Sequence, residues 1–320
     1  MQKLSFIFLI TLLICFQNSF AQQPKKPTAV DIYSQIQKLN FLGSVLYIAA
    51  HPDDENTRLI SYMANHQKAR TGYLSLTRGD GGQNLIGTEL RELLGVIRTQ
   101  ELIEARKIDG GEQFFSRAND FGYSKIPNET LKVWNKDQVL SDMVYVIRNF
   151  QPDVIITRFD HRSPGTTHGH HTSSAMLSQE AFDIAIDKNT YPSQLELVQP
   201  WQPKRLLFNT SYWFYGGKDK FDKADKSALV NLPTGVYYQS LGKSNQEIAA
   251  LSRSRHQSQG FGSTGSRGDD IEYMELIKGN APKEKNNLFE GIDTSWNRIK
   301  GGNAVGTVLQ NVEKNFDFRN

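Results

Sequence analysis

The chain is 320 residues long, and its 37 basic and 34 acidic residues leave a formal net charge of +3. No cluster of lysine and arginine focuses this charge, so the composition gives no argument for nucleic-acid binding. Charged residues make up 22% and hydrophobic residues 38% of the chain, which is ordinary for a folded protein and excludes disorder over most of its length. The length suits one large domain with a sizeable core.

The first 21 residues form a segment of their own. Lys3 precedes an apolar run from Leu4 to Phe16, and polar and small residues follow up to Ala21. The run is too short to span a bilayer comfortably, so we interpret residues 1–21 as a signal peptide. We therefore expect an exported protein, periplasmic or extracellular, without a stable membrane span after cleavage. A retained anchor and a lipoprotein are the alternatives.

The single cysteine, Cys15, lies within this segment. Cleavage would leave a mature chain without a thiol, and therefore without disulfides or a cysteine-based metal site. Any metal must then be bound by histidine and carboxylate side chains.

Beyond a leader with a short helix over residues 22–40, hydrophobic runs alternate with segments of helical periodicity. Continuous apolar runs are typical of strands buried on both faces of a parallel sheet. We expect strands over residues 44–50, 72–77, 114–115, 152–157 and 204–210, and helices over residues 59–64, 89–108, 136–149 and 172–186. This alternation predicts an α/β fold of three layers, Rossmann-like, with helices on both faces of a mostly parallel sheet.

The pattern weakens beyond residue 215. Residues 218–226 are rich in charge and predict a solvent-exposed loop, whereas residues 245–256 predict a helix. No clear closing element ends the sequence. We expect a core over residues 41–215 and an extension of the same domain over residues 216–320, and a longer parent chain remains an open alternative.

Two clusters of histidine and carboxylate residues each follow an expected strand. Residues 51–55 read His-Pro-Asp-Asp-Glu, and residues 168–171 read His-Gly-His-His. The carboxyl ends of parallel strands meet at one edge of a sheet, so both clusters are expected to face the same point. Each cluster alone is as typical of a turn or an exposed loop as of a site. Together they hold four of the seven histidines and predict a metal site; the other three, His66, His161 and His256, are expected at the surface or in supporting positions.

Residues 50–55, Ala-His-Pro-Asp-Asp-Glu, resemble the signature of the PIG-L/LmbE-like deacetylases. That family removes acetyl from N-acetylglucosaminyl-phosphatidylinositol and from the glucosaminyl precursors of mycothiol and bacillithiol. The resemblance covers roughly residues 44–190 and includes Thr-Arg-Gly-Asp-Gly-Gly at 77–82 and Arg-Thr-Gln-Glu at 98–101. It implies an LmbE-like fold and a zinc-dependent N-deacetylase of an N-acetylglucosamine-type sugar or glycoconjugate.

The family pattern implies a role for each residue of the two clusters. His51, Asp54 and His171 would bind the zinc ion, and Asp53 would be the general base that activates the zinc-bound water and later returns a proton to the leaving amine. His168 would stabilise the tetrahedral intermediate. The ligand types also permit another divalent metal, such as iron, cobalt or manganese.

The chain departs from the family pattern at one of these positions. Many relatives have His-Pro-Asp-His where this chain has His-Gly-His-His, so His170 competes with His171 as the third ligand; the spacing favours His171. The resemblance gives Glu55 a structural role that orients the loop or a ligand. Arg78 and Asp80 lie where relatives bind the sugar and are expected to contact substrate, although the adjacent glycines also fit a simple tight turn.

Two other functions remain open. One is a zinc amidohydrolase that acts on a different amide, and the other is a noncatalytic carbohydrate-binding protein, against which the presence of Asp53 argues because binding needs no general base. An aromatic cluster at residues 212–215 would suit stacking on a sugar ring, but core packing is the more usual role of such a cluster. The sequence does not indicate the oligomeric state.

Overall fold

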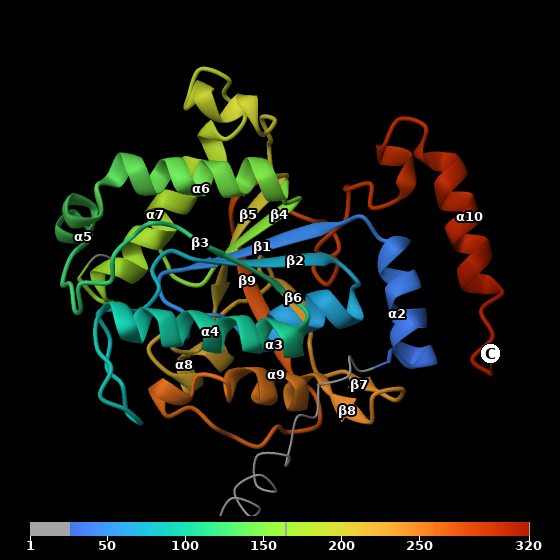
Figure 1. The fold of residues 1–320 in the computed structure, drawn as a ribbon, viewed down its shortest axis with the longest axis horizontal. Helices are drawn as coiled ribbons and strands as arrows, with labels where there is room; N and C mark the ends of the chain where they lie inside the picture. Colours follow the sequence, from blue (N-terminus) through green and yellow to red (C-terminus); the bar gives the residue numbers. More distant parts are fainter. Residues whose placement is uncertain (1–25, 164, 320) are drawn as a thin grey trace, which may run out of the picture.

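The computed structural model describes residues 26–163 and 165–319, so the expected signal peptide over residues 1–21 lies outside the described residues. At the centre of the described part is a seven-stranded sheet with the order β3-β2-β1-β4-β5-β9-β6 (Figure 1). The first five strands in this order are parallel, whereas β9 is antiparallel to β5 and to β6. Their bounds are β1 (Ser44–Ala49), β2 (Arg70–Ser75), β3 (Glu112–Phe115), β4 (Val154–Thr157), β5 (Arg205–Thr210), β6 (Val230–Pro233) and β9 (Ile271–Gly279).

Helices cover both faces of this sheet (Figure 1). One layer consists of α5, α6 and α7, which pack on one another, and the other of α3, α4 and α9. Their bounds are α3 (Thr57–Ser61), α4 (Glu92–Asp109), α5 (Pro127–Trp134), α6 (Lys136–Phe150), α7 (Gly169–Ile184) and α9 (Asn245–Arg253). The expected α/β fold with three layers and a mostly parallel sheet is confirmed.

The central strand β1 explains why the two helical layers are needed. All six of its residues are buried. Val45 and Tyr47 join the core on one face, and Leu46 and Ile48 join the core on the other. Successive side chains of a strand point to opposite faces, so a continuous apolar run is stable only when both faces are covered.

Beyond residue 215, the structure corrects one expectation and adds two strands that the sequence did not indicate. Residues 218–226 contain a short helix, α8 (Lys218–Lys223), in place of an exposed loop. Phe221 is buried against Tyr215 and Tyr273, and this apolar anchor fixes a segment that is otherwise charged. In addition, β9 and β6 extend the sheet, although the alternating polar residues of β9 do not resemble the buried parallel strands.

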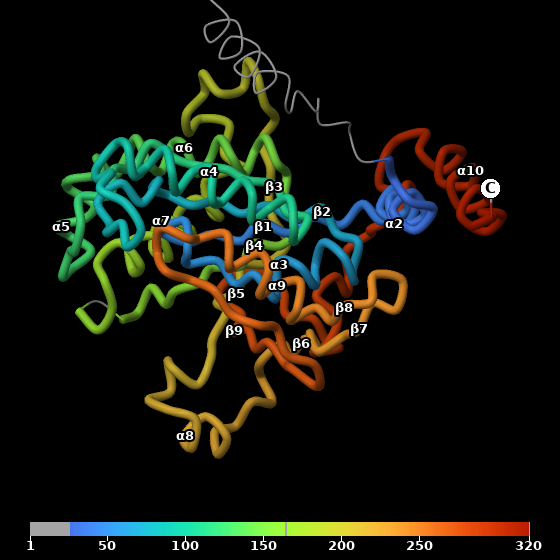
Figure 2. Tube along the Cα trace, turned by 60° about the horizontal axis from the view of Figure 1, so that its bottom comes forward, coloured from blue at the N-terminus to red at the C-terminus, as the bar shows by residue number. Residues whose placement is uncertain are grey.

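The last helix, α10 (Gly302–Lys314), lies beside α2 (Ala29–Leu39) at one end of the molecule (Figure 2), where no closing element was expected. The Asn40 side-chain amide donates a hydrogen bond to Glu313 at 2.6 Å, and the Trp296 indole donates one to the Leu39 carbonyl at 2.8 Å. Small elements complete the described chain: a π-helical turn (Tyr62–His66), the hairpin strands β7 (Tyr237–Tyr238) and β8 (Lys243–Ser244), and three short 3-10 turns (Pro192–Glu196, Gln257–Gln259 and Trp296–Arg298). None of the described helices is long and apolar enough to span a bilayer.

Candidate metal and catalytic site

The loop that follows β1 folds back on itself and brings Asp54 against His51. The backbone N–H of His51 donates a hydrogen bond to Asp54 Oδ2 at 2.8 Å, and His51 Nδ1 lies 3.0 Å from the same oxygen. The Tyr73 hydroxyl donates a hydrogen bond to the His51 carbonyl from the neighbouring strand β2. This turn is therefore fixed by its own carboxylate and by the sheet.

The second histidine cluster begins α7, and a glycine allows that helix to start there. Gly169 packs so closely on the segment before α5 that an added Cβ would lie 2.5 Å from Ser124 Oγ and 2.8 Å from the Ile126 carbonyl oxygen. His168 caps the helix, and its Nδ1 accepts a hydrogen bond from the backbone N–H of His170 at 3.1 Å. The His-Gly-His-His sequence thus places three imidazoles on the first turn of α7.

His51, Asp54 and His171 form one candidate metal site. Each offers a ligand atom, and these atoms all lie within 4.8 Å of one another. His171 Nε2 is 3.5 Å from Asp54 Oδ1. The His171 ring stacks on Phe159 with 3.8 Å between ring centroids and 2° between planes, so its orientation is set before a ligand binds.

The charge states of this site follow from burial and mutual attraction. Burial lowers the pKa of His171 to about 4, so its imidazole is neutral at pH 7. Burial alone raises the pKa of Asp54, but the adjacent His171 and His51 outweigh it and hold that pKa below its ordinary value. For His51, burial lowers the pKa and Asp54 raises it, with a net rise. An ionised carboxylate and a neutral imidazole are the forms that bind metal, so Asp54 and His171 are already in these forms, whereas a metal would displace the proton that Asp54 favours on His51.

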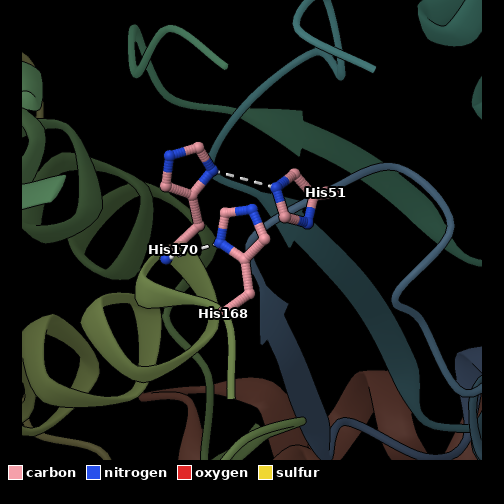
Figure 3. Close-up of side chains that lie close together, drawn as sticks. All are labelled: His51, His168 and His170. Carbon is pink, nitrogen blue, oxygen red and sulfur yellow. Dashed lines mark hydrogen bonds between the residues drawn. The ribbon is translucent and has the colours of Figure 1, made fainter. Parts of the chain in front are cut away.

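On its other side, His51 contacts the remaining histidines of the second cluster (Figure 3). His51 Nε2 shares a hydrogen bond of 3.0 Å with His170 Nδ1, and the ligand atoms of His51, His168 and His170 also lie within 4.8 Å of one another. His170 is fully buried, with Phe121 and Trp134 packed against its ring. The two competing histidines therefore have different positions: His171 faces Asp54, whereas His170 lies behind His51.

Asp53 points away from this turn toward α4, where Arg98 holds it. Arg98 is only 3% exposed, and its Nη2 donates a hydrogen bond to Asp53 Oδ1 at 2.5 Å while Nη1 donates to the Gly79 carbonyl at 3.1 Å. Gly79 has a φ of +69°, and an added Cβ would lie 2.3 Å from the guanidinium. In the sequence, Arg98 belongs to a segment that resembles the family, but no role could be assigned to it. The structure shows that it contacts Asp53.

Glu55, the last residue of the first cluster, is turned into the interior. It is 3% exposed, and its Oε1 lies 2.6 Å from His256 Nε2 and 3.3 Å from Arg106 Nη2. Arg106 also binds Asp109 through Nη2. His256 is fully buried, so it is a supporting residue and the surface position expected as an alternative is wrong.

Arg78 and Asp80 do not line the pocket beside Asp54 and His171. They line a different cavity of about 450 Å³. The Arg78 guanidinium stacks over Phe115 at 4.2 Å and donates a hydrogen bond to Thr99 at 3.1 Å. Their expected contact with substrate stays a prediction.

A pocket of about 670 Å³ opens over Asp53, Asp54 and His171. It extends to the loop after β5, to α9, and to residues 263–266. Pockets of about 300–1,000 Å³ bury most of a bound small molecule. The site therefore combines a metal-ligand group, a held carboxylate and a ligand-sized space at the carboxyl edge of the parallel strands.

Comparison with known proteins connects this site to a family. Residues 46–182 match the model of the GlcNAc-PI de-N-acetylase family, PIG-L. A curated relative, the 1D-myo-inositol 2-acetamido-2-deoxy-alpha-D-glucopyranoside deacetylase of Kineococcus radiotolerans, is 27% identical over 208 residues, which cover 54% of this chain and 56% of the relative. The chain thus spans little more than half the length of that relative.

Two solved structures are also similar. The N,N'-diacetylchitobiose deacetylase from Pyrococcus horikoshii is 17% identical with a TM-score of 0.48, covering 75% of this chain and 82% of that one. The 4-carboxy-2-hydroxymuconate hydratase from Pseudomonas putida KT2440 is 17% identical with a TM-score of 0.48, covering 77% of this chain and 100% of that one. The family match rests on the sequence of residues 46–182, and this part of the chain is a PIG-L family domain.

Proposed function

We propose that this protein is a metal-dependent deacetylase that hydrolyses the N-acetyl group of an N-acetylglucosamine-type sugar or glycoconjugate. The observation that carries the proposal is the group formed by His51, Asp54 and His171, whose ligand atoms lie within 4.8 Å of one another; Asp54 and His171 line one pocket together with Asp53. The match of residues 46–182 to the PIG-L family and the deacetylase activity of the curated relative support it.

The three residues fit a catalytic zinc ion. Two imidazoles and one carboxylate are a usual protein ligand set for zinc, and three protein ligands leave a position open. The hydrogen bond between His51 Nε2 and His170 Nδ1 suits this assignment, because a metal-bound imidazole usually donates its other N–H to a partner. With His51 as donor, its Nδ1 keeps a free electron pair on the side of Asp54. When bound, zinc supplies Lewis acidity that lowers the pKa of water to about 7.

Asp53 is the proposed general base. Its carboxylate lines the pocket next to the metal-ligand group, and a carboxylate in this position takes the proton of the attacking water and delivers one to the leaving amine. Arg98 fixes one carboxylate oxygen, which leaves the other oxygen for proton transfer. Arg98 is therefore a positioning residue for Asp53.

His168 is the proposed donor to the developing oxyanion. Its Nδ1 accepts a hydrogen bond from the His170 backbone, so in the neutral ring the proton resides on Nε2. Burial lowers the pKa of His168, which keeps the ring neutral at pH 7. A neutral imidazole with a fixed N–H is a suitable donor to the negative charge that forms on the carbonyl oxygen.

The proposal includes an exported location, supported by the apolar run that follows Lys3. An extracellular or periplasmic enzyme of this kind would act on glycans or glycoconjugates outside the cytoplasm. The alternatives are an amidohydrolase of a different amide and a noncatalytic carbohydrate-binding protein.

Acetate release distinguishes these functions. The purified mature protein would be incubated with a panel of N-acetylglucosamine compounds before chelation, after chelation and after zinc is restored. We expect release that stops with the chelator and returns with zinc. Stoichiometric metal without release from any compound would contradict the proposed function and favour a different amide or a binding role.

A further inference from the structure

The pocket over the metal-ligand group has a wall that the proposed chemistry does not use. Tyr212 and Trp213 line it, yet their side chains are 55% and 62% exposed. Core packing, the more usual role of such a cluster, is therefore wrong for these two residues. Two large aromatic side chains that are exposed in one pocket are a surface that a ligand can cover.

These two rings stand on a rigid support. The turn after β5 is closed by backbone hydrogen bonds from Phe214 N–H to the Ser211 carbonyl at 3.0 Å and from Gly217 N–H to the Tyr212 carbonyl at 2.9 Å. Phe214 packs edge-on against Phe208 of β5 with 4.8 Å between ring centroids, and Trp213 packs edge-on against Phe214 at 5.4 Å. The aromatic surface is thus preorganised and loses little conformational entropy when a ligand binds.

Polar side chains of α9 also line the pocket. Gln246 of α9 is only 7% exposed and donates a hydrogen bond to the Gly268 carbonyl at 2.9 Å. Its Oε1 is buried and has no hydrogen-bond partner among the described residues, so the side-chain amide would have to turn to bring that oxygen to a ligand hydroxyl in the pocket. Arg253, on the same helix, stacks on Phe261 and donates a hydrogen bond to the Asp53 carbonyl at 3.3 Å. This contact connects α9 to the loop that carries Asp53.

We propose that Tyr212, Trp213 and Gln246 form a second sugar subsite, which binds the glycan residue next to the one that is deacetylated. The inference rests on the proposed function and specifies its substrate as an oligosaccharide. A sugar ring has apolar C–H faces and a rim of hydroxyls. The exposed aromatic rings complement the faces, and the side chains of Gln246 and Arg253, which also line the pocket, offer polar partners to the rim. A purely apolar substituent would use only the aromatic rings.

The first test measures substrate preference. N-acetylglucosamine, its β1,4-linked trimer and its octyl glycoside would be compared as substrates of the intact protein and of Trp213→Ala. We expect the intact protein to prefer the trimer, and the ratio of its kcat/KM for the trimer to that for the monosaccharide to fall about tenfold in Trp213→Ala, which corresponds to about 1.4 kcal/mol. Tyr237→Ala, which removes a half-exposed tyrosine outside the pocket, is the matched control and should keep the ratio.

Equilibrium binding separates the subsite from the chemistry. Titration calorimetry with zinc-loaded protein carrying Asp53→Asn would give trimer affinity with and without Trp213→Ala and Gln246→Ala. Weaker trimer binding in both variants supports the subsite even if no acetate is released, in which case only the deacetylase proposal fails. Equal preference ratios and equal affinities in all variants, or a preference for the octyl glycoside over the trimer, would overturn the subsite while leaving the deacetylase proposal in place.

Discussion

Arg98 donates a hydrogen bond to Asp53 from a position 45 residues later in the chain, at 2.5 Å. The arginine is buried, whereas the carboxylate lines the pocket. Such an ion pair fixes the position of the Asp53 side chain, because a movement away from Arg98 would leave a buried charge without its partner. The position of the proposed base is therefore set from α4 and not only by its own loop.

Replacement of Arg98 tests this positioning role. In Arg98→Ala, the metal-ligand residues keep their own contacts, so we expect unchanged metal content and a kcat lower by about 10-fold to 100-fold, less than the loss of a general base itself. Arg98→Lys should recover part of kcat, because it restores the charge without the second hydrogen bond to Gly79. Metal analysis and steady-state kinetics on the folded variants measure the two quantities. A wild-type kcat in Arg98→Ala would contradict the positioning role of Arg98.

The proposed general base and a proposed metal ligand of the first loop, Asp53 and His51, are expected to have separable roles. Asp53→Asn keeps the shape of the side chain and removes its basicity, so it should retain zinc and lose turnover. His51→Ala should lose both, because it removes a ligand. Metal content by mass spectrometry and acetate release by the same preparations would decide; full activity in Asp53→Asn would remove Asp53 from the mechanism.

His170 and His171 should differ in their effect on metal affinity. His170→Ala removes the partner of His51 Nε2, and loss of such a partner weakens metal binding by about 10-fold to 100-fold. His171→Ala removes a proposed ligand and should abolish stoichiometric metal binding. Competition with a chromophoric chelator measures the metal affinity of both variants independently of enzyme activity. Retention of metal in His171→Ala together with its loss in His170→Ala would reverse the assignment of the ligand.

His256 should contribute to stability through Glu55. In His256→Ala the buried Glu55 carboxylate keeps its contact with Arg106 but loses its short hydrogen bond to His256. Leaving a buried polar group without a hydrogen bond lowers the free energy of unfolding by about 1–3 kcal/mol. Urea denaturation gives the change in the free energy of unfolding. His161→Ala, at a partly exposed position beside Asp160, is the control and should change it by less than about 0.5 kcal/mol. Equal effects of the two substitutions would contradict a role for His256.

Gly169 should be indispensable to the geometry of α7. An alanine there brings Cβ to 2.5 Å from Ser124 Oγ, so the helix start must shift, and overpacking of this kind costs about 1–3 kcal/mol. Because His168, His170 and His171 lie within two residues of Gly169, a shift of the helix start would move them as well. We therefore expect metal affinity to fall together with stability. Gly262→Ala, where an added Cβ meets nothing within 4 Å, is the matched control. Normal metal affinity in Gly169→Ala would show that the first turn of α7 tolerates the displacement.

The amino-acid sequence determined the layered fold and the identity of the clusters. Strands such as β1 are buried on both faces and therefore consist of a continuous run of apolar residues. This local pattern can be recognised in the sequence without the structure. Each histidine cluster lies in the connection after such a strand, the first directly after β1 and the second between β4 and α7, so their convergence at one sheet edge was predictable from topology alone. The resemblance of residues 50–55 to the deacetylase signature added the expected roles.

Tertiary structure alone decided which supporting residues meet these clusters. No spacing rule connects Arg98 with Asp53 or His256 with Glu55, because contacts between distant segments depend on how α4 and α9 pack on the sheet. The distinction between His170 and His171 required the orientation of each ring, which the first turn of α7 and the stacking on Phe159 determine. Local patterns encode strands and motifs, whereas the packing of whole elements decides the neighbours of a side chain.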